Sequence, residues 1–128
     1  MIDVACAIIV SPSKQVLVAQ RSAGMKHPLK IEFPGGKIEP GESPSECIVR
    51  EIKEELNIEI YPVFEMPPHI YSYPDITVRL TPFVCNVIDG EIKLKEHSSY
   101  AWVIPAALMS LDWLEADIPV MKHYLNLA

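Results

Sequence analysis

One segment, residues 35–58, constrains this chain more than any other, because it combines a glycine-rich turn with a sharply bounded helix. Ser43 suits the N-cap of that helix, Pro44 its first position, and Glu46 completes a Ser-x-x-Glu capping box. The helix should end at Leu56, because the asparagine that follows can adopt the left-handed conformation of a C-terminal cap. The pattern therefore predicts a helix over residues 44–56.

The two faces of this helix differ in chemistry. One face carries an apolar stripe: Ile48, Val49, Ile52 and Leu56. Beside it, Glu51, Glu54 and Glu55 share an arc at the negative end of the helix dipole, and each unfavourable interaction there costs a few tenths of a kcal/mol. A hard divalent cation prefers oxygen ligands and would explain this arrangement. The alternative is a solvated helix end.

The spacing of the fixed residues distinguishes these readings. Gly36 and Glu42 are followed by the run Arg50-Glu51-Ile52-x-Glu54-Glu55-x-Asn57-Ile58. This pattern resembles the Nudix box, which belongs to hydrolases acting on nucleoside diphosphates linked to another group. Only Asn57 departs from it, where the family usually has glycine, and asparagine tolerates the same backbone geometry.

Length and charge narrow the alternatives. The 128 residues, 49% of them hydrophobic, are expected to form a single domain, residues 1–128, with a core of its own. A net charge of −6 argues against a nucleic-acid polymer as partner, but not against a nucleotide bridged by a metal. The three cysteines lack the spacing of a disulfide framework or zinc site, and no apolar run is long enough for a membrane. We expect a cytoplasmic protein without a membrane partner.

The rest of the chain alternates mainly between strands and turns. Strands are expected at residues 2–11, 15–20, 29–33, 59–66, 70–73, 76–87 and 100–104, and helices at residues 105–111 and 119–127, the last with Pro119 at its start. The first two strands are expected to pair as a hairpin. These elements predict an α/β protein with a mixed sheet covered on both faces, which agrees with the Nudix-type α/β/α sandwich that the resemblance implies.

The resemblance also implies roles for the residues of the box. Glu51, Glu54 and Glu55 would bind Mg²⁺ or Mn²⁺ together with the backbone carbonyl of Gly35. Arg50 would orient one of these glutamates, and Glu42 would lie outside the metal shell. The paired glycines let the backbone approach metal and phosphates closely, which places Gly36 and Lys37 at the substrate.

Beyond the box, the chain is similar to the MutT-type nucleoside triphosphate pyrophosphohydrolases of the family. Glu96, six residues before Trp102, matches a loop glutamate that reaches the metal and can act as general base; Glu51 and Glu55 are alternatives for that role. Four residues match positions that line the nucleobase pocket: Arg21, Phe33, Tyr73 and Asp117. Core packing is the alternative for the two aromatic residues, and a helix N-cap is the alternative for Asp117. The four histidines are expected mostly at the surface or the pocket rim.

The leading hypothesis is therefore metal-dependent hydrolysis of a (deoxy)nucleoside triphosphate to the monophosphate and pyrophosphate. Oxidised guanine nucleotides and cytidine nucleotides are the first substrates to test. Asp117 replaces the asparagine of enzymes specialised for oxidised guanine, which leaves the base open. The alternatives are another Nudix substrate, such as a nucleotide sugar or dinucleoside polyphosphate, and a non-catalytic nucleotide-binding module. The intact glutamates and Arg50 argue against the last one.

Overall fold

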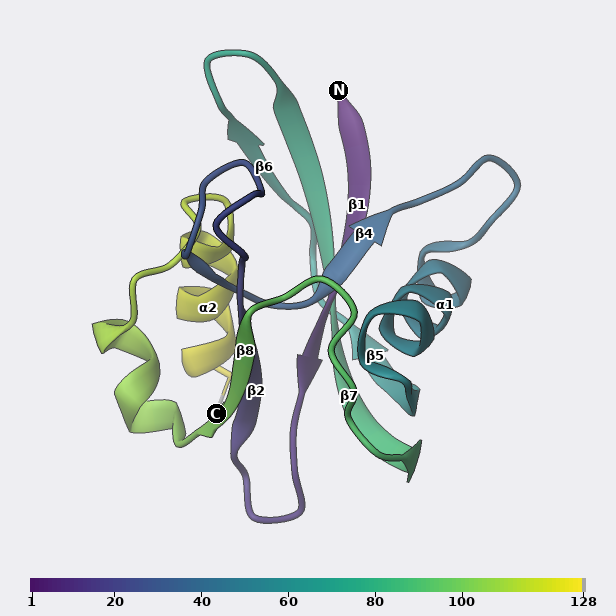
Figure 1. Ribbon diagram of the computed structural model, residues 1–128. Coiled ribbons are helices and arrows are strands. Elements are labelled where there is room, and N and C mark those ends of the chain that lie inside the picture. Colours follow the sequence, from purple (N-terminus) through teal and green to yellow (C-terminus); the bar gives the residue numbers. More distant parts are fainter. Residues whose placement is uncertain (128) are drawn as a thin grey trace.

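The computed structural model describes residues 1–127 and contains two sheets between two helical layers (Figure 1). The strands are β1 (Ile2–Ile9), β2 (Val16–Gln20), β3 (Ile31–Glu32), β4 (Gly35–Lys37), β5 (Ile58–Glu65), β6 (His69–Ser72), β7 (Thr77–Gly90) and β8 (Ser99–Val103). The helices are α1 (Pro44–Leu56), the 3-10 helix η1 (Pro105–Ser110) and α2 (Asp117–Leu125). The predicted α/β class with a mixed sheet is confirmed.

The larger sheet is built around β1. Its strand order is β4-β1-β7-β5, with β6 also paired to β7. The pairing of β1 with β7 is parallel, and the other pairings are antiparallel. The second sheet, with the order β3-β2-β8, was not predicted.

The predicted hairpin between the first two strands is wrong. Val10 and Val16 form one isolated bridge, but β1 and β2 then diverge into different sheets. Strand β7 pairs along one edge of β1 from Ile2 to Ile9, and β4 occupies the other edge at Val4–Cys6, so β2 cannot extend along the whole of β1. Strand β4 was also missed, because the two glycines in it suggest a turn.

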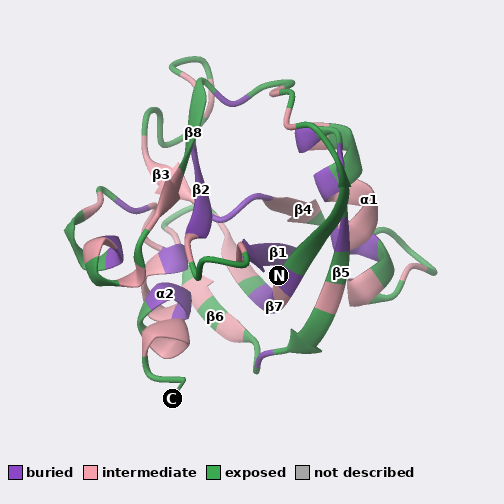
Figure 2. Ribbon diagram, turned by 90° about the horizontal axis from the view of Figure 1, so that it is seen from below, coloured by how far each residue is buried: buried purple, intermediate pink, exposed green. Residues whose placement is uncertain are grey.

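The alternation of side chains along β1 separates two hydrophobic cores. Ala5, Ala7 and Ile9 pack in the core beneath α1, and Cys6 and Ile8 pack in the core that includes residues of η1 and α2. All five are at most 2% exposed. Figure 2 shows the buried positions on the inward sides of both helices. Burying one large aliphatic side chain contributes about 1.5–3 kcal/mol, so this strand anchors both layers.

Helix α1 has the predicted bounds. The Ser43 side chain accepts a hydrogen bond from the Glu46 amide at 3.1 Å, and Glu46 Oε1 accepts one from the Ser43 amide at 2.9 Å. Asn57 ends the helix in the left-handed conformation, with φ of 62°. These contacts fix where the helix starts and stops, and so where its carboxylates lie.

The C-terminal part differs from the prediction in two details. Residues 105–110 form a 3-10 helix, and α2 begins at Asp117, two residues before the expected Pro119. The N-cap of α2 is Ala116, and no side chain caps the helix there. The alternative role of Asp117 as an N-cap is therefore wrong. No helix within residues 1–127 is long and apolar enough to span a membrane.

Candidate active site

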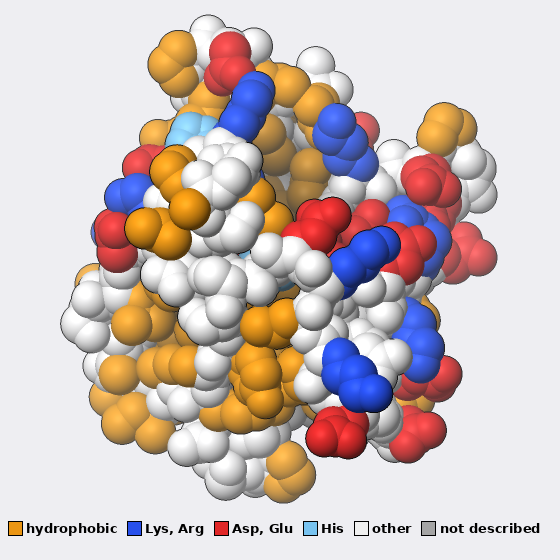
Figure 3. Space-filling view, viewed as in Figure 1, with side chains coloured by type: hydrophobic (Ala, Val, Ile, Leu, Met, Phe, Trp, Pro, Cys, Tyr) orange, Lys and Arg blue, Asp and Glu red, His pale blue; other side chains and the backbone are white. Residues whose placement is uncertain are grey.

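A cavity of about 460 Å³ lies where the two sheets meet. Its lining includes nine of the residues predicted for the site: Arg21, Phe33, Gly35, Gly36, Lys37, Tyr73, Glu55, Glu96 and Asp117. In Figure 3, charged side chains gather on the α1 side of this face, and apolar side chains dominate over β8 and η1. The cavity thus has a carboxylate end at α1 and a second end at the start of α2.

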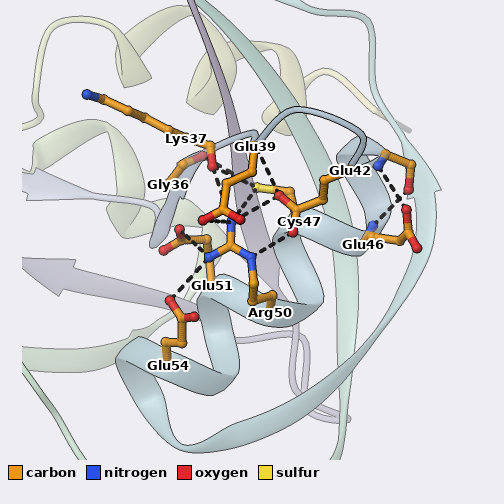
Figure 4. Close-up of polar contacts among 10 residues, drawn as sticks. Gly36, Lys37, Glu39, Glu42, Glu46, Cys47, Arg50, Glu51 and Glu54 are labelled. Atoms are coloured by element: carbon orange, nitrogen blue, oxygen red, sulfur yellow. Dashed lines mark hydrogen bonds and ion pairs between the residues drawn. The ribbon is translucent and has the colours of Figure 1, made fainter.

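Arg50 organises the carboxylates of α1 (Figure 4). Its Nε and Nη2 donate to the two oxygens of Glu42 at 2.6 and 3.0 Å, a bidentate pair. Its Nη1 donates to Glu51 at 3.0 Å and to Glu54 at 3.2 Å. The hydrogen bond from Arg50 lowers the pKa of Glu42 to about 2. Glu42 is therefore an ionised partner of Arg50 and lies on the opposite side of the guanidinium group from Glu51 and Glu54.

Glu55 lies in a different environment from its neighbours. Its Oε2 atom is buried without a hydrogen-bond partner. Burial and the nearby carboxylate of Glu51 raise the pKa of Glu55 to about 8, and Glu32 and Glu96 add to the effect. A buried carboxyl group with an unpaired oxygen among three other carboxylates is an unfavourable arrangement that a cation would relieve.

The paired glycines allow close approach from two sides. A Cβ atom on Gly35 would collide with the carbonyl oxygen of Ala5 on β1, and one on Gly36 would collide with the carboxylate of Glu51. Glycine is therefore required where β4 packs between β1 and the carboxylates of α1. Lys37, which is exposed and lines the cavity, extends its side chain away from Arg50 (Figure 4).

Glu96 reaches the carboxylate end from a segment without regular structure. The backbone of this segment is bound to the end of α1, because Lys93 N–H donates to the Leu56 carbonyl at 3.0 Å and Lys95 N–H donates to the Glu55 carbonyl at 3.2 Å. The fold thereby brings Glu96 beside Glu55, forty-one positions away in the sequence.

The opposite end of the cavity is formed by Asp117 and its neighbours. Asp117 is 4% exposed, and its Oδ2 accepts a hydrogen bond from the Phe33 amide at 2.8 Å. Burial raises the pKa of Asp117 well above its usual range, and the charge of Glu32 acts in the same direction. The protonated acid is thus favoured, and it can both donate and accept a hydrogen bond.

The aromatic residues at this end have more than one contact. Phe33 is buried against Trp113, with ring centroids 4.7 Å apart, and also lines the cavity. The Tyr73 hydroxyl accepts a hydrogen bond from the Ala116 amide at 3.0 Å, directly before Asp117. Packing and pocket lining are therefore combined in Phe33, and Tyr73 contacts the start of α2 through its hydroxyl group.

Two further residues of the cavity were missed. They are Glu32 and His97. The Oε1 atom of Glu32 accepts a hydrogen bond from Arg21 Nη1 at 2.9 Å, and its Oε2 atom lies 2.7 Å from His97 Nε2. The histidines were expected mostly at the surface or the pocket rim, and His97 lines the cavity but is buried. No local pattern indicates this pair, because the two residues are 65 positions apart. The position of His97 directly after Glu96 was the only available signal.

A larger cavity of about 700 Å³ lies elsewhere, between the turn at residues 11–14 and β8. Its lining includes Lys14 and Asn86 but no carboxylate or histidine. Water and phosphate chemistry needs polar groups that can bind metal or move protons. The smaller cavity is therefore the candidate active site.

The carboxylate end has the chemistry that a divalent metal requires. Its donors are all oxygen atoms, which Mg²⁺ and Mn²⁺ prefer, and Glu55 holds one of them unpaired and buried. Within residues 1–127, no three acidic, histidine or cysteine side chains converge closely enough to hold a metal as they stand. Glu51 and Glu54 are instead directed to Arg50, so a bound ion would have to compete with that arginine for them.

Comparison with known proteins gives a consistent result. Residues 1–124 match the NUDIX domain family. The chain is 32% identical to the CTP pyrophosphohydrolase of Escherichia coli, over 99% of this chain and 93% of that enzyme. It is also 32% identical to the 8-oxo-dGTP diphosphatase of Escherichia coli, over 98% of both. The solution structure of the Escherichia coli ORF135 protein matches with a TM-score of 0.85 and 32% identity, covering 99% of this chain and 90% of that one.

Proposed function

The chain belongs to the NUDIX family, and from this premise we propose that it hydrolyses nucleoside triphosphates to the monophosphate and pyrophosphate. The observation that carries the proposal is Glu55, a buried carboxyl group with an unpaired oxygen beside Glu51 and Glu96 at one end of the cavity. This is where a polyphosphate and its metal can be bound, with the base directed toward Asp117.

Nudix hydrolases generally need a divalent metal, and we propose Mg²⁺ or Mn²⁺ here. Glu51, Glu54 and Glu55 would hold it, with Glu96 and the carbonyl oxygen of Gly35. Such an ion neutralises phosphate oxygens and lowers the pKa of bound water.

The protein groups supply position and charge. Arg50 fixes Glu51 by its hydrogen bond, and Glu42 holds Arg50 from the other side. Lys37 is exposed and lines the cavity, so its ammonium group can offset phosphate charge. Glu96, Glu51 and Glu55 are the candidates for the general base, because each lies at the carboxylate end with an oxygen that can take a proton from water.

Recognition of the base is assigned to the opposite end, with Arg21, Phe33 and Tyr73 as its walls. Asp117 offers a donor and an acceptor when protonated. Cytosine presents its N4 amine beside the N3 acceptor, and 8-oxoguanine carries a hydrogen on N7 beside the O6 acceptor. Unmodified guanine has only acceptors, O6 and N7, on that edge. An Asp117 that addresses the N7 edge of a purine would therefore favour 8-oxo-dGTP, and likewise CTP and dCTP, over dGTP. Two of the relatives that match the chain over nearly its whole length act, by name, on CTP and on 8-oxo-dGTP.

The test is release of phosphate from a nucleotide panel in the presence of added inorganic pyrophosphatase and Mg²⁺. We expect phosphate from CTP, dCTP or 8-oxo-dGTP only when the pyrophosphatase is present, and the monophosphate as the other product. Phosphate release without pyrophosphatase would contradict the proposed bond cleavage. Turnover confined to nucleotide sugars or dinucleoside polyphosphates would favour another Nudix substrate, and binding without turnover would identify a non-catalytic module.

We also propose that the protein acts in the cytoplasm. All three cysteines are free and buried, which is compatible with a reducing compartment.

A further inference from the structure

Glu96 is exposed, lines the cavity and lies in a segment that has no helix or strand. The role proposed for it in hydrolysis needs its carboxylate at a defined place. The residues on either side of it provide the constraint. Lys95 N–H is bound to the Glu55 carbonyl at 3.2 Å, and Ser98 N–H is bound to the Gln20 carbonyl at 3.0 Å. His97 lies between these two backbone contacts. It is also the only buried residue among positions 91–101.

The contact of His97 is specific in its chemistry. An ionised carboxylate only accepts, so the Nε2 atom that lies 2.7 Å from Glu32 Oε2 carries the hydrogen. The other ring nitrogen, Nδ1, is buried without a partner. A buried polar atom without a partner is unfavourable, so an apolar side chain would serve packing alone at least as well as this ring. The histidine therefore has a role that depends on its hydrogen bond.

Glu32 connects this contact to the other end of the cavity. Its second oxygen accepts from Arg21 Nη1 at 2.9 Å, and Arg21 Nε donates to the Lys26 carbonyl at 2.8 Å. The Glu32 side chain is only 14% exposed, so both contacts are shielded from water. The Glu32 carboxylate thus contacts both His97, next to Glu96, and Arg21, which is proposed to line the base pocket.

We propose that His97 and Glu32 are positioning residues, which hold Glu96 at the carboxylate end of the cavity and set that segment relative to Arg21. The inference rests on the proposed function, since it assumes that Glu96 takes part in hydrolysis. Neither residue touches the reacting atoms. Their effect is to restrict where the Glu96 carboxylate can lie.

The activity test compares two substitutions of the same residue. His97→Leu removes the donor, and we expect kcat to fall about ten- to a hundredfold with little change in KM, because small displacements of catalytic groups have effects of this size. His97→Gln places an amide nitrogen where Nε2 lies and should recover most of kcat. Lys93→Ala, an exposed side chain in the same segment, is the matched control and should match the wild type. Equal losses in both His97 variants would overturn the proposal.

A second readout does not depend on activity or on bound metal. Amide hydrogen exchange of the metal-free protein should accelerate at Lys95 and Ser98 in His97→Leu and remain slow in His97→Gln. The amides of Cys47 and Ile52 in α1 should be unchanged in both. Unchanged exchange at Lys95 and Ser98 would contradict the anchoring role, and loss of protection in α1 as well would show a general structural role instead.

The decisive comparison uses Glu96→Gln as a background. If His97 acts through Glu96, His97→Leu should lower kcat less than about threefold once Glu96 is already replaced. The full loss in both backgrounds would overturn the inference while leaving the proposed function intact. Absence of nucleotide hydrolysis by the wild-type protein would instead contradict the proposed function, and the exchange experiment would still test the anchor.

Discussion

The two ends of the cavity are built in different ways. At the carboxylate end, Arg50 contacts Glu42, Glu51 and Glu54, which are eight, one and four positions away in the sequence. At the base end, the amide of Phe33 contacts Asp117, 84 positions away. The first arrangement is mostly encoded within one segment, whereas the second exists only when the residue after β3 meets the start of α2 in the folded protein. We therefore expect the reaction chemistry and the choice of base to respond to different substitutions.

The largest effect is expected at the carboxylate end. Glu55→Gln removes a charge from the proposed metal site, and kcat should fall by about 10²–10³ for every base, because developing charge on the phosphates is less well stabilised. Steady-state kinetics with CTP and 8-oxo-dGTP measure this, with a thermal melt to show that the variant is folded. A loss confined to one base would contradict the separation of the two ends.

Metal binding should have the next largest effect, on stability. The charges of Glu51 and Glu54 and the buried carboxyl of Glu55 are relieved when a cation binds the folded state. At a hundredfold excess over Kd this stabilises by about 2.7 kcal/mol. Thermal melts with saturating Mg²⁺ or Mn²⁺ and with chelator measure the difference, and Glu55→Gln should reduce it. A melting temperature that the metal leaves unmoved would argue against the proposed site.

These local features explain how much of the protein could be predicted. Ser43, Glu46 and Asn57 specify α1 by contacts within or next to the helix, so its bounds were predicted correctly. The partners of β1 and β2 were not, because both strands are short apolar runs and nothing in their periodicity indicates which edges β4, β7 and β8 will occupy. Strand pairing depends on the whole fold rather than on neighbouring residues.

The same distinction applies within the candidate site. The carboxylates of α1 lie within one local segment, whose spacing resembles the Nudix box and so predicts their role. The contacts of Glu32 with His97, and of Tyr73 with Ala116, join residues 65 and 43 positions apart and are absent from any local pattern. Matching Asp117 to a family position suggested the pocket, and the structure shows that its side chain contacts the Phe33 amide and does not cap α2.

At the base end, the test is Asp117→Asn. Because one oxygen of Asp117 accepts from the Phe33 amide, the asparagine should keep its oxygen there and present its NH₂ group to the base. That group donates only, so kcat/KM for CTP should fall relative to dGTP by roughly 5- to 150-fold, which corresponds to one buried unpaired polar group at about 1–3 kcal/mol. Equal losses on all bases would mean that Asp117 does not read the base.

A smaller effect is expected from Tyr73→Phe. This change removes the acceptor for the Ala116 amide at the start of α2 and leaves the aromatic wall in place. The discrimination between CTP and dGTP should weaken roughly two- to tenfold, in line with about 0.5–1.5 kcal/mol for one hydrogen bond. Tyr71→Phe, two residues earlier on β6, is the control and should keep the wild-type ranking. Discrimination that is equal in the two variants would show that the hydroxyl of Tyr73 does not position Asp117.

The central claim is that one end of the cavity performs the hydrolysis and the other selects the base. The most direct test is kcat/KM for CTP, dCTP, dGTP and 8-oxo-dGTP in the wild type, Glu55→Gln, Asp117→Asn and the double variant. The account predicts that the double variant combines the uniform loss of the first substitution with the changed ranking of the second, because independent sites contribute additively. A double variant with the wild-type ranking, or with losses more than about tenfold from the product of the single effects, would contradict it.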